Sequence, residues 1–378
     1  MTYIARNDQS VIGRWWYEID RGLIWLVLPL IFAGWVVVFS GSAQEVLQGS
    51  EALTSFSVRK LLFVCAALIS LFGLSLLQPA QVERLTPFSF ICSILLLLSI
   101  FVIGVSENNA TRWIAIPGLP FAPQPTEFAK PALVLMIAFF LSRAHIWGFG
   151  RALLASGAVF LGSATLVAVQ PDISQAVFFL LIFLGLLFFA GLAFEWIFLL
   201  IVLGCGVFSL AYVTLAHVRS RLDGFFKRIL GADGDKRDHN DMAADAFRDG
   251  GLGGLGLGEG RLKTFIPEAK NDMPLAIIGE ELGLFGSLVL FSSFIFLWRR
   301  VQRRLPFLDT DFQRLGALGL IFFLVAQALV NIFYTVGLIP TTGITLPFFS
   351  DGGSSLIASA ASIGLLLALT RQRRSAGA

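Results

Sequence analysis

Charge is scarce in this sequence. Only 14% of the 378 residues are Asp, Glu, Lys or Arg, whereas soluble globular domains carry about 25%. So little charge cannot cover a water-exposed surface, which excludes a soluble enzyme, and the 56% of hydrophobic residues excludes a disordered chain. The net charge of +3 is too small to indicate nucleic acid as a partner.

Cysteine is rare as well. Cys65, Cys92 and Cys205 each lie within an apolar run. This pattern excludes a small secreted module held together by disulfides. We expect the three residues to pack as small core side chains rather than to bind metal.

Hydrophobic residues gather in runs of about 20, the length of an α-helix that crosses a bilayer. The first run follows a polar and aromatic segment and is too long for the apolar region of a cleavable signal peptide. We therefore predict an all-α polytopic membrane protein with ten transmembrane helices. The predicted spans are residues 22–40, 60–78, 88–105, 126–144, 152–170, 174–194, 196–215, 274–298, 315–335 and 352–370.

Arginine and lysine in the short connections indicate the orientation. With residues 1–21 in the cytoplasm, the short outer connections hold only Arg59, Lys60 and Arg112. The cytoplasmic side then holds Arg6, Arg14, Arg21, Arg84, Arg143, Arg151, Arg299, Arg300, Arg303, Arg304, Arg314, Arg371, Arg373 and Arg374. Because short cytoplasmic loops carry the excess of positive charge, both termini, including the tail 371–378, are predicted to be cytoplasmic.

One connection is much longer than the others. Residues 216–273 form a long extracytoplasmic loop between spans 7 and 8, with ten Lys or Arg and ten Asp or Glu. Its glycine-rich part, 250–260, contains the pattern GxGxxG but lacks the strand and helix that make this pattern a dinucleotide site. The glycines instead favour close backbone approach to a neighbouring helix or a bulky ligand. We find no internal repeat and treat residues 1–378 as one membrane domain.

Charged residues mark the start of span 4. Pro125 and Thr126 are typical of a helix start, with Thr126 as the N-cap. Glu127 and Lys130 are three residues apart and therefore share a helix face. They form either a pair at a helix end or a carboxylate and a cation that line a site at the outer membrane face. Trp113, in the preceding loop, is either an interface aromatic or a stacking face beside Arg112.

Two aspartates precede other spans at the same outer level. Asp172 follows Pro171 and suits a helix cap, as does Asp272 before Pro274. The alternative for Asp272 is a carboxylate directed into an outer cavity, where it can act as a general base. Lys270 would lower the pKa of Asp272 if the two side chains are close.

The connection between spans 9 and 10 is irregular. Residues 337–355 combine two prolines and several glycines with hydroxyl and acidic side chains, ending in Ser354 and Ser355. Irregular backbone at membrane depth cannot face lipid. We expect this segment to be a re-entrant wall of a site.

Together these segments resemble the SEDS family, whose members shape, elongate and divide bacterial cells. The matches follow the family's order between residues 20 and 370, so the resemblance covers nearly the whole chain. Residues 342–347 and 217–221 resemble the cell-division branch more than the elongation branch. The matching segments are residues 111–114, 124–130, 170–172, 258–260 with Lys263, 267–269, 279–283 and 346–355.

The resemblance implies a peptidoglycan glycosyltransferase. Its substrate is lipid II, a disaccharide pentapeptide on undecaprenyl diphosphate, polymerised at the outer face with inversion at the anomeric carbon. Asp272 matches the family's essential aspartate and is the candidate general base. A divalent cation (Mg²⁺ or Mn²⁺) would assist the cationic side chains at the diphosphate, and no organic cofactor is expected. The candidate substrate-binding residues are Arg112, Trp113, Glu127, Lys130, Arg219, Arg221, Lys263, Ser354 and Ser355.

Family members work with a monofunctional class B penicillin-binding protein, which crosslinks the glycan. The resemblance therefore implies this partner, other proteins of the division machinery, and a multi-pass location in the bacterial cytoplasmic (inner) membrane at the division site. Besides lipid II, the chain would contact membrane lipid.

Two segments depart from the family pattern. The family usually has His-Thr-Asp-Phe at 270–273, where this chain has Lys-Asn-Asp-Met, and Ser-Tyr-Gly-Gly at 350–353, where it has Ser-Asp-Gly-Gly. Asp272 is kept, but a positioning histidine is lost, and Asp351 adds negative charge near a site for a diphosphate. Both changes bear on the catalytic rate.

Two other functions compete with the enzyme. A lipid II flippase predicts polar groups spread through the membrane thickness, whereas the candidate residues lie at the outer ends of their spans. Glu195 and the pair Glu280 and Glu281 lie elsewhere, and we interpret them as structural. A catalytically weak scaffold that activates a partner transpeptidase is the third hypothesis, favoured by the departures at Lys270 and Asp351.

Overall fold

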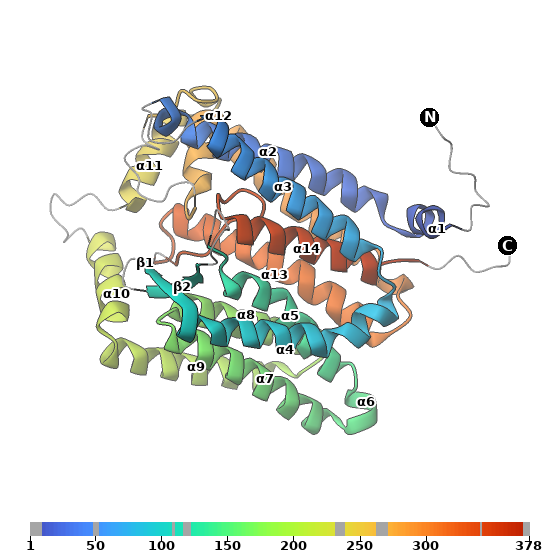
Figure 1. Cartoon of the computed structure of the whole chain (residues 1–378). Coiled ribbons are helices and arrows are strands. Elements are labelled where there is room, and N and C mark those ends of the chain that lie inside the picture. Colours follow the sequence, from blue (N-terminus) through green and yellow to red (C-terminus); the bar gives the residue numbers. More distant parts are fainter. Residues whose placement is uncertain are drawn as a thin grey trace.

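The computed structural model describes residues 10–47, 53–107, 110–115, 122–230, 239–261, 271–340 and 342–372. Long helices dominate it, which confirms the all-α membrane fold (Figure 1). In these ranges, seven helices are long and apolar enough to cross a membrane. They are α2 (Arg21–Leu47), α3 (Leu53–Ser75), α4 (Pro79–Ile103), α7 (Phe149–Val169), α9 (Phe194–Thr214), α12 (Pro274–Gln302) and α13 (Asp311–Thr335).

Three shorter helices coincide with the remaining predicted spans. α8 (Ile173–Phe189) and α14 (Gly353–Leu369) are mostly apolar. α5 (Pro125–Leu141) carries Glu127 and Lys130 near its start and is buried along most of its length. Since α4, α7, α8, α13 and α14 all pack against it, α5 places two charged residues in the centre of the helix bundle.

The outer helices each bury one stripe of side chains. On α7 the buried residues are Ala152, Ser156, Ser163 and Val167, which recur at helical spacing on one face. Small residues of this kind let membrane helices approach closely. The opposite face of such a helix is left for lipid, and it includes Leu154 and Leu161. Cys65 and Cys205 are also exposed, so the prediction that they pack in the core is wrong for these two.

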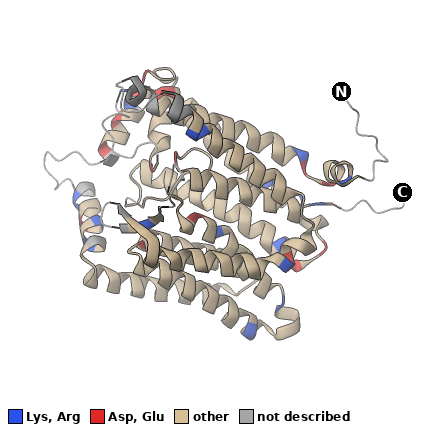
Figure 2. Ribbon diagram, in the orientation of Figure 1, with Lys and Arg blue, Asp and Glu red and all other residues tan. Residues whose placement is uncertain are grey.

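The two ends of the bundle differ. At one end lie the antiparallel strands β1 (Gly104–Glu107) and β2 (Ala110–Ile114), with α10 (Ala216–Ile229) and α11 (His239–Gly250). The other end holds α1 (Val11–Glu18), α6 (Ala144–Trp147) and the C-terminal end of α14 (Figure 1). A short 3-10 helix, Leu305–Phe307, joins α12 to α13. Figure 2 shows most charged residues at these two ends, as expected for a membrane protein.

Several elements differ from their predicted bounds. α4 begins at Pro79 rather than at residue 88, because the polar residues at its cytoplasmic end continue the helix and Glu83 pairs with Arg143 over 2.8 Å. The hairpin and the helices α10 and α11 fall in connections that were predicted only as loops. These elements are too polar to appear in a search for apolar runs.

α2 and α12 are joined near both membrane faces. At the cytoplasmic end, Asp20 is fully buried and accepts hydrogen bonds from Arg300, the shortest at 2.7 Å, and from Arg304. At the outer end, the Ser40 hydroxyl donates to the Glu281 carboxylate. α12 is thereby held in a fixed position, and its outer end begins directly after Asp272.

Candidate active site

A buried ion pair lies at the start of α5. Lys130 has no exposed surface, and its Nζ lies 2.7 Å from Oε1 of Glu127. The same ammonium donates to Oε1 of Gln327 on α13 over 3.3 Å and lies 5.7 Å from the centre of the Phe178 ring. The two charges share a helix face as their spacing predicts, and each offsets the desolvation of the other.

Hydrogen bonds continue from this pair into the re-entrant segment, defined here as residues 342–352. The amide of Gln327 donates to the carbonyl and the hydroxyl of Thr345, each over 2.9 Å. The Thr345 hydroxyl lies 2.8 Å from that of Ser355, while Ser354 Oγ accepts a bond from the backbone N–H of Gln124. Residues 344–350 are buried, as predicted for a wall of irregular backbone.

Asp272 faces the same segment. It is half-buried and precedes the N-cap of α12, which is Met273, so the predicted cap is displaced by one residue. The side-chain amide of Asn331 donates to the carbonyl of Asp272 and to that of Ile344, both over 2.7 Å. A Cβ atom added to Gly343 would lie 3.7 Å from Oδ2 of Asp272. The carboxylate therefore lies against the glycine of the re-entrant segment.

Helix α13 contacts both the buried ion pair and Asp272. Gln327, which contacts Lys130, and Asn331, which holds Asp272, are four residues apart, or about 6 Å along the helix axis. The ion pair and the candidate base are thus held by neighbouring turns of one buried helix.

The predicted N-cap of α5 is also displaced, because the helix starts at Pro125 after Gln124 and the Thr126 hydroxyl has no hydrogen-bond partner.

Arg112 and Trp113 come from strand β2. The Arg112 guanidinium lies 3.4 Å from Oδ2 of Asp172 and donates to the carbonyl of Pro171 over 3.1 Å. Burial raises the pKa of the Asp172 carboxyl, which lies in the turn between α7 and α8, and the charge of Arg112 opposes that rise. Asp172 therefore fixes the hairpin on the outer end of the bundle. Trp113 is half-buried beside it.

The other predicted cations are spread out. Arg221, on α10, donates to the hydroxyl of Ser174 over 3.4 Å and so lies on the side of Arg112 and Asp172. Arg219 instead donates to the carbonyl of Val213 over 2.6 Å and so caps a carbonyl at the C-terminal end of α9. Lys263 and Lys270 lie outside the described residues.

The glycine-rich segment packs against α12 through its backbone. Leu255 and Gly256 donate their N–H groups to the carbonyls of Glu280 and Glu281, each over 3.0 Å. α12 is interrupted at Gly283, which has a φ of +66° and frees these carbonyls from the helix. Close approach to a neighbouring helix was the predicted role of the glycines and is observed here. The buried carboxylate of Glu280 accepts a bond from the backbone N–H of Arg261, and that of Glu281 accepts one from Ser40 of α2, in agreement with a structural role.

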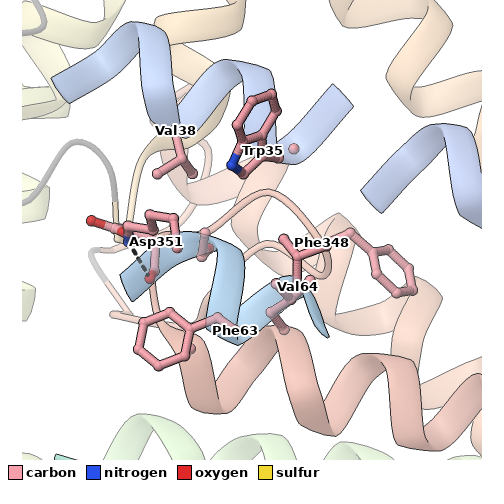
Figure 3. Close-up of a pocket in the computed structure, with 11 residues that line it drawn as sticks. Trp35, Val38, Phe63, Val64, Phe348 and Asp351 are labelled. Atoms are coloured by element: carbon pink, nitrogen blue, oxygen red, sulfur yellow. Dashed lines mark hydrogen bonds and ion pairs between the residues drawn. The ribbon is translucent and has the colours of Figure 1, made fainter. Parts of the chain in front are cut away.

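Asp351, one of the departures from the family pattern, pairs with Lys60 in the N-terminal half of α3. The added negative charge is therefore matched by a cation. The pair borders a small pocket between α2, α3 and the re-entrant segment. Figure 3 shows Trp35 and Val38 on one side of Asp351, and Phe63 and Val64 on the other.

Within the described ranges, no three His, Cys, Asp or Glu side chains converge on one point. These residues therefore do not form a ligand set for a divalent cation, which usually binds several carboxylate or carbonyl oxygens. We derive no catalytic step through a metal ion.

The fold and the site define a polytopic helical membrane protein with a polar site at its extracytoplasmic end. Residues 21–375 match the FtsW, RodA and SpoVE family of cell cycle proteins. The chain belongs to this family, which is the SEDS family that the sequence motifs indicate.

Individual relatives are similar over nearly their full length. A protein of Caulobacter vibrioides named probable peptidoglycan glycosyltransferase FtsW is 32% identical, over 98% of this chain and 93% of the relative. One of Haemophilus influenzae with the same name is 32% identical, over 94% and 91%. These names agree with the predicted similarity to the cell-division branch.

Solved structures have a similar fold. A chain from a study of how a peptidoglycan synthase complex coordinates polymerization and crosslinking superposes with a TM-score of 0.75 at 26% identity, covering 93% of this chain and 97% of that one. The rod-shape-determining protein RodA of Thermus thermophilus gives a TM-score of 0.68 at 25% identity, over 94% and 97%.

Proposed function

We propose that this chain is a peptidoglycan glycosyltransferase that polymerises lipid II at the outer face of the cytoplasmic membrane during cell division. One observation carries the proposal: a carboxylate at the extracytoplasmic end, Asp272, faces a buried irregular segment and is held by the helix that also contacts Lys130. The names of the relatives support the same chemistry.

In the proposed reaction, the hydroxyl oxygen of the acceptor sugar attacks the anomeric carbon of the donor. The bond from that carbon to the diphosphate oxygen breaks, and undecaprenyl diphosphate leaves with the electron pair. Asp272 accepts the proton of the attacking hydroxyl, which is the role of a general base. A single displacement of this kind inverts the anomeric centre and requires no covalent enzyme intermediate.

Cations would stabilise the charge that develops on the leaving diphosphate. Arg112 and Arg221 lie on one side of the extracytoplasmic end, and Lys263 belongs to the segment that leads to Asp272. Trp113, beside Arg112, offers a surface for stacking. A Mg²⁺ or Mn²⁺ ion bound with the diphosphate would supply further positive charge there.

Glu127 and Lys130 have a different role in this proposal. Both are buried and bonded to protein groups, so they act on the substrate through Gln327, Thr345 and the serines of α14. They set the position of the re-entrant segment, and Ser354 and Ser355 lie where that segment enters α14.

The proposed partner is a class B penicillin-binding protein in the division machinery, with the chain located at the division site of the inner membrane. The structural similarity to a component of a peptidoglycan synthase complex supports such a partner. Coupling to a transpeptidase would crosslink each glycan strand as it is made.

The test is polymerisation of purified lipid II by the full-length protein with its partner. Asp272→Asn keeps the size of the side chain but removes the base, and we expect the rate to fall about 10²- to 10⁴-fold. Asp249→Asn makes the same change on an exposed residue of α11 and serves as the control. Glycan strands that persist in Asp272→Asn would remove Asp272 as the base. If the wild type makes no glycan strands but moves lipid II across the vesicle membrane, the result would favour a flippase. If it does neither, the result would favour a scaffold.

A further inference from the structure

Lys60 and Asp351 join two segments that are far apart in the sequence. Lys60 Nζ pairs with the Asp351 carboxylate and also donates to the Asp351 backbone carbonyl over 3.0 Å. The side chains are 8% and 18% exposed, respectively. Because the lysine holds both the side chain and the backbone of Asp351, it fixes the end of the re-entrant segment as well as neutralising a charge.

The other end of the same segment lies beside the candidate base. The Asn331 amide donates one hydrogen bond to the carbonyl of Ile344 and another to that of Asp272. Gly343 packs against the Asp272 carboxylate. Thr345 bonds to Gln327, which contacts Lys130. The segment is therefore attached to the site at 343–345 and to α3 at 351.

Between these points the segment is tightly held. The backbone of Phe348 lies directly against Gly34 of α2, where there is no space for a Cβ atom. Phe348 has a φ of +70°, which costs about 1–2 kcal/mol for a residue with a side chain. A segment in this conformation keeps its shape only when the surrounding structure holds it in place. Near the C-terminal end of the re-entrant segment, one side of the segment borders the pocket of Figure 3 and is not packed against other residues there.

We propose that Lys60 and Asp351 are a positioning pair for polymerisation: their ion pair fixes the re-entrant segment so that residues 343–345 meet Asp272 in the reactive arrangement. This inference rests on the proposed function. Neither residue touches the reacting atoms. Displacement of a catalytic group by about 1 Å lowers a rate by about 100-fold, so a distant anchor can control the rate without binding the substrate.

Exchange of the two charges tests the pair. Asp351→Asn keeps the shape of the side chain and removes its charge, and Lys60→Met removes the cation while keeping most of its length. The double variant Lys60→Asp with Asp351→Lys restores an ion pair in which the two charges have changed places. Each is measured as full-length protein with its partner, for kcat and KM with lipid II and for thermal unfolding in detergent.

We expect each single variant to lower kcat about 10- to 100-fold while KM changes less than about threefold, because positioning acts on the transition state. The charge exchange should recover part of the lost kcat, because it restores the ion pair but leaves the backbone carbonyl of residue 351 without its donor. Glu83→Gln, which breaks the Glu83–Arg143 pair at the cytoplasmic end, is the matched control and should keep wild-type kcat.

Wild-type kcat in Asp351→Asn would overturn the inference. A second result would also overturn it: kcat falls together with thermal stability, and the charge exchange recovers neither. That result would show that the pair is structural only. The proposed function fails in a different way: the wild type itself then makes no glycan, and both conclusions are withdrawn.

Discussion

The side-chain amide of Asn331 donates a hydrogen bond to the backbone carbonyl of Asp272 over 2.7 Å. The other hydrogen of this amide is bonded to the carbonyl of Ile344 over the same distance. One fully buried side chain on α13 therefore fixes the candidate base and the segment that faces it relative to each other. Asn331 should thus affect catalysis without contacting the substrate.

The first prediction concerns Asn331→Ala. This change leaves two backbone carbonyls without their donor, a loss of about 1–3 kcal/mol for each buried group. We expect a lower kcat for polymerisation and a lower unfolding temperature. Thr335→Val, one turn away, removes only a bond from the hydroxyl to the Asn331 carbonyl within the same helix and is the control. Equal rates in the two variants would show that α13 does not position Asp272.

The second prediction concerns the buried pair on α5. Lys130→Met leaves the Glu127 carboxylate without its cation, and removal of one partner from a buried pair costs about 3–5 kcal/mol. Adding Glu127→Gln removes the remaining charge, so the double variant should recover much of the lost thermal stability. Polymerisation should stay low in both, because Gln327 has lost the ammonium that it binds. Thermal unfolding in detergent and glycan synthesis are the two measurements. A double variant less stable than Lys130→Met would contradict the argument.

The membrane architecture could be predicted because its signals are local. Each span is a run of apolar residues, and the arginines that orient the spans are their direct neighbours. The spacing of Glu127 and Lys130 predicts their shared face for the same reason, since an i,i+3 relationship is fixed by helix geometry. The glycines of 250–260 predict close packing, although the sequence does not indicate that α12 is the partner.

The rest of the site depends on contacts between distant residues. Gln327 lies 197 positions from Lys130, and Asp351 lies 291 positions from Lys60. No local pattern encodes these pairs. Signals were nevertheless present: Gln327 and Asn331 are two amides four residues apart in an otherwise apolar span, and Lys60 and Asp351 are opposite charges at the same membrane level. The helices α10 and α11 were missed because their apolar residues are spaced one turn apart among polar ones, so neither helix contains a long apolar run.

The third prediction concerns the cytoplasmic joint between α2 and α12. Asp20→Asn removes a buried carboxylate that accepts bonds from Arg300 and Arg304. Because Arg300 and Arg304 keep partial access to water, we expect a loss of stability of about 1–3 kcal/mol, seen as a lower unfolding temperature. KM for lipid II should be unchanged because the joint lies at the opposite end from the site. Asp311→Asn, at a residue whose side chain is 61% exposed, should have no effect. A change in KM without a change in stability would contradict this assignment.

The last prediction concerns the joint between the glycine-rich segment and α12. Gly254 has a φ of +80° and lies against the backbone of Glu281, whereas an added Cβ atom at Gly253 would meet nothing within 4 Å. Gly254→Ala should separate the segment from the broken turn of α12, because the new methyl group and the strained backbone act together, the strain alone costing about 1–2 kcal/mol. Gly253→Ala should be neutral. Limited proteolysis of the extracytoplasmic segment 216–273 and thermal unfolding in detergent separate the two variants. Faster cleavage in Gly254→Ala alone supports the joint, and the same cleavage rate in both would show that the backbone contacts with Glu280 and Glu281 do not hold the segment in place.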